Sequence, residues 1–462
     1  MIQALQDISP VTRALSDYVA EALGRPLPEE VAEKARHHFL DTLAAMVSGT
    51  HLYPGKMALT YIATLGGTKE STVIGSRIRT SAVNAALAGG MLAHADETDD
   101  SHAPSRNHPG CAVVPAALAI AEQAHADGER FLRAVVLGYD IAARLNYALD
   151  ADAFAAASRS THSVGGTFGA GAAAGALLGL NAEQVRHLFS YCAQQASGVA
   201  CNVRDSEHVE KAFDFGGMPA RNGVTAATMV AAGFTGVDDV FSGERNFFEA
   251  YAPNPNPALL AEELGTRFEI LRTNIKKWSV GSPAQSALDA LTYLMETEKL
   301  TVEQVAEIDV HLPTRSARTV DNAPMPDVNV QHLLAMLLVD GALSFESVHD
   351  HGRMEDPNIL IVRQRIRLIP SEELMHARPR RQAIVEVTTN DGRRLSRRTL
   401  AVRGTADNPM NRNEVEAKAG DLIAAVLGVR RANKIIRTVR DLSSMSDVGQ
   451  LARLCRPQEN AR

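Results

Sequence analysis

The order of helical and strand signals along the chain constrains its fold more than any other feature. Helical patterns fill the first part, over roughly 260 residues. Near Thr273 the pattern changes, and segments of alternating apolar residues follow one another. Helical patterns return after Pro409. We therefore predict a mainly α protein with an α+β part: a large all-helical domain (1–270 together with 408–462) and a smaller inserted α+β lid domain (271–407).

Local signals place several helices in the first part. Pro10 suits the first turn of a helix and Gly24 its C-terminal end, and an amphipathic stretch covers residues 28–46. Asn181 starts a capping-box pattern in front of apolar residues at helical spacing. The small-residue run 165–175 lacks the GxGxxG order of a dinucleotide-binding loop, so we expect it to allow close helix packing.

Strand signals occupy the region after Thr273. Apolar residues alternate at 308–312 and again at 366–368. An apolar run at 384–387 leads through Asn390-Asp391-Gly392, a turn sequence typical of hairpins, to a second apolar run at 400–402. These segments predict a small sheet with a hairpin.

Composition limits the classes of protein and partner. The chain has 462 residues, 45% of them hydrophobic but only 5% aromatic, which favours helices packed through small side chains. A net charge of −7 makes nucleic acid an unfavoured partner. The four cysteines form no CxxC pair, and Met1–Asp7 has no basic, then apolar, leader pattern. We expect a cytoplasmic protein without a membrane partner.

The segment from His94 to Pro115 gathers more titratable groups than folding requires. Crowded carboxylates and imidazoles shift one another's pKa values, and general acid–base catalysis uses such shifts. A solvated loop is the alternative, but an apolar helix directly after His108-Pro-Gly favours an active site. The titratable side chains are those of His94, Asp96, Glu97, Asp99, Asp100, His102 and His108.

Metal binding is a competing interpretation of the same segment. Five of its side chains could be ligands, but their spacing matches no HExxH or other known coordination motif. The chain also lacks a GxSxG elbow, a Walker A loop and kinase signatures, which serine hydrolysis and phosphoryl transfer require. The five potential ligands are Glu97, Asp99, Asp100, His102 and His108.

Four further residues could contribute to a pocket. Lys211 precedes glycines that permit tight turns, so its ammonium group could face inward. Lys276 and Lys277 come before Ser282-Pro283, which we predict to be an N-cap and first turn that add positive potential; a solvated hinge is the alternative. His162 could face a pocket or be a buried core histidine.

Taken together, these stretches resemble the MmgE/PrpD family, which includes 2-methylcitrate dehydratase, cis-aconitate decarboxylase and iminodisuccinate epimerase. The resemblance covers nearly the whole chain. Its motifs are His94-Ala-Asp-Glu-Thr-Asp-Asp-Ser-His with His108-Pro-Gly, Thr161-His162 before the small-residue helix, Lys211 before Ala220-Arg-Asn-Gly, and Ile275-Lys-Lys-Trp.

The resemblance implies a homodimer whose active site lies between a helical domain and an inserted lid. It implies no cofactor and no metal, and a small anionic carboxylate as substrate. Carried over by motif, the catalytic residues are His108, His162, Glu97 and Lys276, and the substrate-binding residues are Ser101, Lys211 and Lys276.

Family members make or break a C–H bond beside a carboxylate. We expect a cofactor-independent lyase of the hydratase or dehydratase type acting on a small di- or tricarboxylic acid, with an epimerase of a substituted succinate as the alternative. A metal-assisted hydrolase and a non-enzymatic carboxylate-binding protein are less favoured. Two departures matter: Glu97 replaces the usual aspartate, and residues 319–326 lack the tyrosine of decarboxylase-like members.

Overall fold

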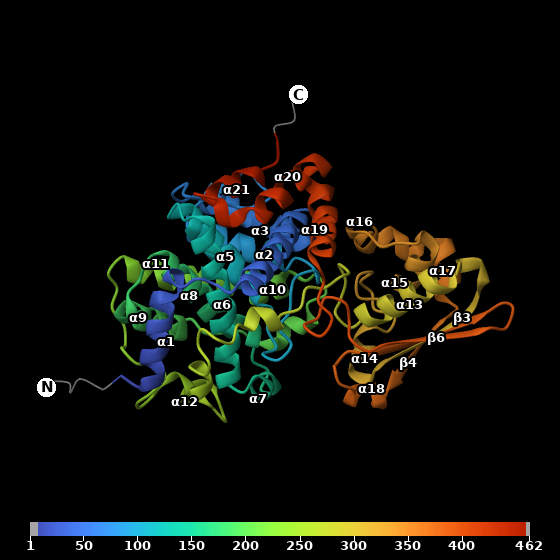
Figure 1. Cartoon of the computed structure of the whole chain (residues 1–462), viewed down its shortest axis with the longest axis horizontal. Coiled ribbons are helices and arrows are strands. Elements are labelled where there is room, and N and C mark those ends of the chain that lie inside the picture. The colour runs from blue at the N-terminus through green and yellow to red at the C-terminus, as the bar shows by residue number, and fades with distance from the viewer. Residues whose placement is uncertain (1–7, 459–462) are drawn as a thin grey trace. The chain divides into compact units, whose positions relative to one another are not determined.

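The computed structural model describes residues 8–458 and forms two compact units (Figure 1). Unit 1 contains the described residues up to Thr273 and those from Leu422 onward, and unit 2 is Asn274–Asp421. The second boundary lies within helix α19 (Arg412–Leu427). The described chain is mainly helical with a small mixed sheet, which confirms the predicted fold class. Met1–Asp7, from which the absence of a leader was predicted, lies outside the described residues.

Unit 1 consists mostly of helices. A short two-stranded ribbon, β1 (Ser71–Thr72) with β2 (Arg79–Thr80), departs from the predicted all-helical pattern. The helices are α1 (Pro10–Glu21), α2 (Glu29–Gly49), α3 (Tyr53–Leu65), α4 (Ala82–Ala93), α5 (Pro109–Gln123), α6 (Gly128–Ala148), α7 (Ala151–Ala156), α8 (Thr161–Leu177), α9 (Ala182–Gln194), α10 (Val209–Ala212), α11 (Met218–Ala231), α12 (Phe247–Tyr251), α20 (Val429–Arg440) and α21 (Gly449–Leu454).

Two predicted helix starts in unit 1 are found in the structure. Ser9 caps α1 by accepting from the backbone N–H of Thr12, and Pro10 occupies the first helical position. Asn181 and Gln184 form both hydrogen bonds of the capping box at α9, each 3.0 Å long. The local sequence therefore determines where these helices begin.

Small residues let α8 pack against its neighbours α6 and α11 at close range. A Cβ on Gly169 would lie 2.5 Å from the backbone oxygen of Gly138 in α6. A Cβ on Gly223 would lie 2.4 Å from the backbone nitrogen of Gly171. The run 165–175 is therefore a packing surface, as predicted, because a side chain would push the helices apart.

Unit 2 has a four-stranded sheet of order β4-β3-β5-β6, in which β3 and β4 are parallel and the other pairs antiparallel. The predicted alternation at 308–312 is confirmed, because Ile308, Val310 and Leu312 are buried in β3. Helices α13 and α15 lie on one side of the sheet and complete the core (Figure 1). The elements are β3 (Val305–Pro313), β4 (Ile366–Ser371), β5 (Ala383–Thr389), β6 (Arg394–Thr399), α13 (Gln285–Glu298), α14 (Thr314–Val320), α15 (Val330–Asp340), α16 (Phe345–His349), α17 (Pro357–Arg363) and α18 (Glu372–His376).

The predicted strand at 400–402 is wrong. The second hairpin strand is β6, which ends at Thr399, and Leu400 after it is exposed. β6 is an outer strand of the sheet and carries Arg394, Arg397 and Arg398. Because a charged outer strand shows little apolar alternation, its sequence gives a weak strand signal.

The predicted N-cap at Ser282 is also wrong. Helix α13 begins at Gln285, and its N-cap residue is Ala284. The amide nitrogen of the Gln285 side chain donates to the backbone oxygens of Trp278 and Val280, at 2.8 and 2.9 Å. These bonds hold the preceding residues in a turn, so the helix starts later than the Ser-Pro pair suggests.

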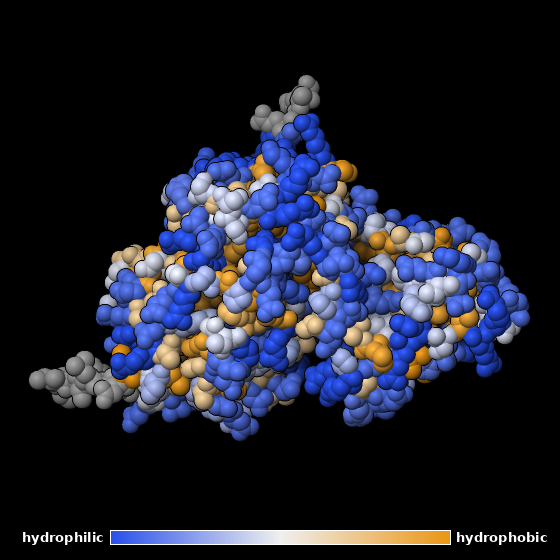
Figure 2. Space-filling model, viewed as in Figure 1, coloured by the Kyte–Doolittle hydropathy of each residue, from blue (hydrophilic) through white to orange (hydrophobic). Residues whose placement is uncertain are grey.

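No helix within residues 8–458 is long and apolar enough to cross a membrane. Figure 2 shows hydrophilic residues over most of the visible face, with hydrophobic residues in small separate areas. The large apolar side chains are mostly in the interior of the two units.

We predict that Gly169→Ala destabilises the protein by about 1–3 kcal/mol, because the new methyl group overlaps the backbone of α6. Gly24→Ala is the control, since a Cβ there meets nothing within 4 Å. Urea unfolding of both variants measures the difference. Equal stabilities would contradict the close packing of α8 against α6.

Candidate active site

Most of the loop between α4 and α5 is buried. Asp99 and Asp100 are fully buried, and His102 is 1% exposed. Burial of adjacent carboxylates is costly unless hydrogen-bond donors surround each of them. The solvated-loop alternative is therefore wrong for this segment.

Asp100 joins three helices. Its Oδ2 contacts His38 Nδ1 of α2 at 2.7 Å and accepts from the hydroxyl of Tyr139 of α6 at 2.6 Å. Its Oδ1 accepts from the backbone N–H of Gly110 in the first turn of α5 at 3.0 Å. Burial lowers the pKa of His38 to about 4, so this imidazole is neutral. Asp100 thus fixes the start of α5, directly after His108.

Asp99 holds two imidazoles. Its Oδ2 lies 3.0 Å from His94 Nδ1, and both of its oxygens lie 3.2 Å from His108 Nδ1. Burial would raise the pKa of Asp99, but the charges and hydrogen bonds of the two histidines hold it well below its usual value. An ionised carboxylate only accepts hydrogen bonds, so both Nδ1 atoms carry protons, and Nε2 is the nitrogen at which each ring can gain or lose a proton.

Phe215 organises the imidazoles. Its ring stacks on His162 with centroids 3.6 Å apart and on His94 with centroids 4.5 Å apart. It belongs to a π-helical segment, Phe213–Gly217, that packs against α4. The predicted tight turns at these glycines are wrong: a Cβ on Gly216 would lie 2.1 Å from the oxygen of Gly90, so the glycine allows close approach instead.

Lys211 and Glu97 form an ion pair at the edge of this group of rings. The ammonium group of Lys211 donates to Glu97 Oε1, and it lies 5.3 Å from the centroid of Phe215. Both side chains are partly exposed, at 21% and 15%, and His108 is 13% exposed. These three side chains are therefore in partial contact with solvent, whereas Asp99 and His94, which support His108, are buried.

Two nearby histidines are held neutral. Burial, followed by the charges of His108, His94 and Lys211, lowers the pKa of His162 well below its usual value. Burial and Lys211 lower the pKa of His208 to about 3. Neutral imidazoles beside an ammonium group can accept protons or hydrogen bonds without adding positive charge.

The structure brings four of the six predicted site residues together: Glu97, His108, His162 and Lys211 lie around Phe215. Ser101 is 4% exposed, and its Oγ has no hydrogen-bond partner among the described residues. Lys276 belongs to unit 2, where it is also buried. The roles of all six residues stay predictions.

Two groups of side chains could hold a metal ion by distance alone. Their ligand atoms lie within 4.8 Å of one another, but Asp99 already accepts from two imidazoles and Glu97 already bonds the Lys211 ammonium group, whose charge opposes a cation. The five ligands proposed from the sequence do not form one group in the structure, since Asp100 and His102 have other partners. The two groups are His94 with Asp99 and Cys111, and His94 with Glu97 and His208.

Sequence reasoning missed two residues of the site. His208 lies three positions before Lys211, which places the two on the same side of a helical turn, and this spacing was an available signal. Phe215 had no such signal, because its stacking depends on the π-helical segment and on the contact of Gly216 with Gly90.

Comparison with known proteins covers both units. Residues 13–260 match the MmgE/PrpD N-terminal domain, and residues 278–444 match the MmgE/PrpD C-terminal domain. The chain is 25% identical to the cis-aconitate decarboxylase-like protein oryM of Aspergillus oryzae, across 96% of this chain and 97% of that protein. It is 21% identical to a cis-aconitate decarboxylase of Aspergillus terreus, across 96% of each chain.

The neutral state of His208 predicts a pH dependence of stability. The unfolded chain protonates this imidazole near pH 6.5, whereas the folded protein does so only near pH 3, so stability falls as the pH decreases between these values. The free energy of unfolding of the parent protein should decrease between about pH 6.5 and about pH 4.5. In His208→Gln this decrease should be about 2 kcal/mol smaller than in the parent protein.

Urea unfolding at several pH values measures this effect. His125→Gln, at a side chain that is 81% exposed, is the control and should leave the dependence unchanged. The same dependence in His208→Gln as in the parent protein would contradict a neutral buried His208.

Proposed function

Because this chain belongs to the MmgE/PrpD family, we propose that it is a lyase of the dehydratase or decarboxylase type that acts on a small di- or tricarboxylic acid. The observation that supports this proposal most is the pair of His108 and Asp99 beside the ion pair of Lys211 and Glu97. One pair supplies an oriented base, and the other supplies a cation for a substrate carboxylate.

His108 removes the proton from the carbon next to a substrate carboxylate. Asp99 accepts the hydrogen bond from Nδ1–H, so Nε2 is the nitrogen that takes the proton. The same carboxylate then stabilises the imidazolium ion that forms. General base catalysis of this kind contributes about 10²–10⁴ in rate.

Lys211 neutralises a substrate carboxylate. Its ammonium group is partly exposed, and a bound carboxylate can share or replace the hydrogen bond that Glu97 now accepts. When the neighbouring carbon loses its proton, negative charge moves onto the substrate carboxylate, and the ammonium group of Lys211 stabilises this charge. Glu97 or His162 then serves as the second acid–base group.

Lys276 of unit 2 is a further substrate-binding and catalytic residue in this proposal. Its neighbour Lys277 is more exposed, at 32%, and its ammonium group lies 3.9 Å from Asp289 and 4.5 Å from the ring centroid of Trp278. Lys276 is 4% exposed. A homodimer and a cytoplasmic location stay predictions from the sequence.

We favour dehydration over decarboxylation. Residues 319–326 contain no tyrosine, the residue that the decarboxylase-like members carry there. Epimerisation is the second candidate because His108 and His162 lie 5.2 Å apart by ring centroid. Two separate imidazoles allow one to remove a proton and the other to return it.

Incubation with substituted succinates and citrates in deuterium oxide, followed by NMR, tests the proposal. Deuterium should enter the carbon beside a carboxylate, and loss of a β-substituent identifies dehydration. Exchange should stop in His108→Gln and persist after treatment with EDTA. No exchange or turnover with any of these acids would contradict the function, and activity that one metal restores after EDTA would contradict proton transfer by side chains alone.

We predict that Lys276→Ala reduces kcat/KM by a factor equivalent to about 2–4 kcal/mol, through loss of a charged contact to the substrate. Lys277→Ala is the matched control and should have a much smaller effect, because its side chain is 32% exposed and water screens its charge. Steady-state kinetics and thermal melts of both variants measure this. Equal kinetic effects would contradict the role of Lys276.

A further inference from the structure

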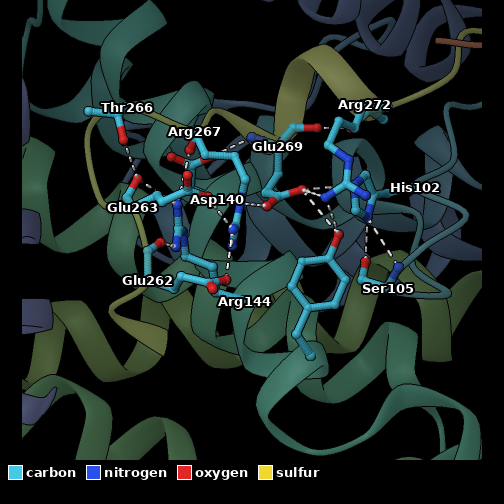
Figure 3. Close-up of polar contacts among 12 residues, drawn as sticks. His102, Ser105, Asp140, Arg144, Glu262, Glu263, Thr266, Arg267, Glu269 and Arg272 are labelled. Atoms are coloured by element: carbon cyan, nitrogen blue, oxygen red, sulfur yellow. Dashed lines mark hydrogen bonds and ion pairs between the residues drawn. The ribbon is translucent and has the colours of Figure 1, made fainter. Parts of the chain in front are cut away.

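Another buried carboxylate lies at the centre of the contacts drawn in Figure 3. The Glu269 side chain is 1% exposed, and Glu269 is the first residue of the 3₁₀ turn Glu269–Arg272. It accepts from Arg267 Nε at 2.8 Å and from Arg272 Nη1 at 3.2 Å. The Tyr147 hydroxyl donates to it at 3.1 Å. One more neighbour comes from the site loop: His102 Nε2 lies 3.3 Å from Glu269 Oε2.

The contacts of His102 determine which nitrogen carries its proton. The backbone N–H of Ser105 lies 3.3 Å from Nδ1 and can only donate, so Nδ1 is an acceptor. Burial lowers the pKa of His102, which keeps the ring neutral with its proton on Nε2. That nitrogen lies 3.3 Å from Glu269 Oε2, in a close electrostatic contact that lacks the geometry of a regular hydrogen bond.

His102 in turn fixes the loop that leads to His108. Its backbone exchanges two hydrogen bonds with Asn107, at 2.7 and 3.2 Å. The Asn146 side chain, which lies in α6, donates to the oxygens of Ser105 and Thr161 at 3.1 and 3.0 Å. The loop between His102 and Asn107 is thus anchored on both sides, and His108 follows it directly.

Glu269 also fixes the end of unit 1. Its backbone N–H donates to Asp140 Oδ1 at 2.7 Å, and its backbone oxygen accepts from Thr273 Oγ1 at 2.9 Å. Thr273 is the last residue of unit 1 before the chain enters unit 2, and Lys276 follows shortly after. One residue therefore orders both the site loop and the segment that leads to Lys276.

We propose that Glu269 is a positioning residue for the reaction: through His102 it holds the 102–107 loop, and thereby His108, in the geometry that proton transfer requires. The effect on the reaction rests on the proposed function, whereas the effect on the loop does not. Glu269 touches none of the six predicted site residues in the contacts that the structure describes, so it acts through His102.

The surroundings of Glu269 allow its charge to be removed without unfolding. Arg267, Arg272 and Tyr147 line a cavity of about 510 Å³ that also borders Pro104 of the loop. Arg272 is 46% exposed and Arg267 is 23% exposed. Water can therefore solvate both guanidinium groups in Glu269→Gln, so no buried charge is left uncompensated.

Glu262→Gln is the matched control. Glu262 Oε2 pairs with Arg267 at 2.8 Å in the same group of contacts, and its side chain is 51% exposed. Figure 3 shows it on the far side of Arg267 from His102. His102→Gln is the complementary variant, which removes the same contact from the loop side and replaces Glu269→Gln if that variant does not fold.

Hydrogen exchange of the substrate-free proteins measures the loop. We expect amides of residues 102–108 to exchange about tenfold faster in Glu269→Gln than in the parent protein and Glu262→Gln. In the deuterium-oxide assay, kcat should fall about tenfold or more with KM nearly unchanged. The double variant of Glu269 and His102 should be no slower than the slower single variant, because both act through one contact.

Three results would overturn the proposal: unchanged exchange of residues 102–108 in Glu269→Gln, faster exchange with unchanged kcat, or additive effects in the double variant. If the parent protein deuterates none of the acids, the proposed function fails by itself. The exchange comparison between Glu269→Gln and Glu262→Gln then still decides whether Glu269 holds the loop.

Discussion

The rest of the structure depends on the burial of two adjacent carboxylates, Asp99 and Asp100. The two side chains contact different groups, and each buried anion has its own donors. Asp100 obtains them from α2, α5 and α6, which places the start of α5. Asp99 obtains them from His94 and His108, which orients the base. The hydrogen bonds that these two buried carboxylates require therefore connect the helices of the core and also order the candidate site.

Small residues make this arrangement possible. The contact of Gly216 with Gly90 brings the π-helical segment against α4, and Phe215 then stacks on His162 and His94. Lys211 lies one turn before Phe215 and reaches Glu97 from there. The close approach of these two backbones thus determines where Lys211, His162 and His94 lie. The packing of unit 1 therefore positions the chemical groups of the candidate site.

The sequence predicts those features that depend on local chemistry. The capping box at Asn181, the strand at 308–312 and the concentration of titratable groups before α5 all follow from residues close together in the chain. The contacts of Asp100 with His38 and Tyr139 could not be predicted, because both residues lie far from it in sequence. β6 was misplaced since an outer, arginine-rich strand shows no alternation, and the role of Glu269 depends on a contact with a residue far away in the chain.

The central claim is that the Asp99 carboxylate fixes His108 with its proton on Nδ1 and its basic nitrogen at Nε2. Nitrogen-15 NMR of the histidine side chains tests this directly, because protonated and unprotonated ring nitrogens have clearly separate chemical shifts. We predict that the neutral ring of His108 has a protonated Nδ1 and an unprotonated Nε2. A neutral ring with its proton on Nε2 would contradict the proposed geometry of the base.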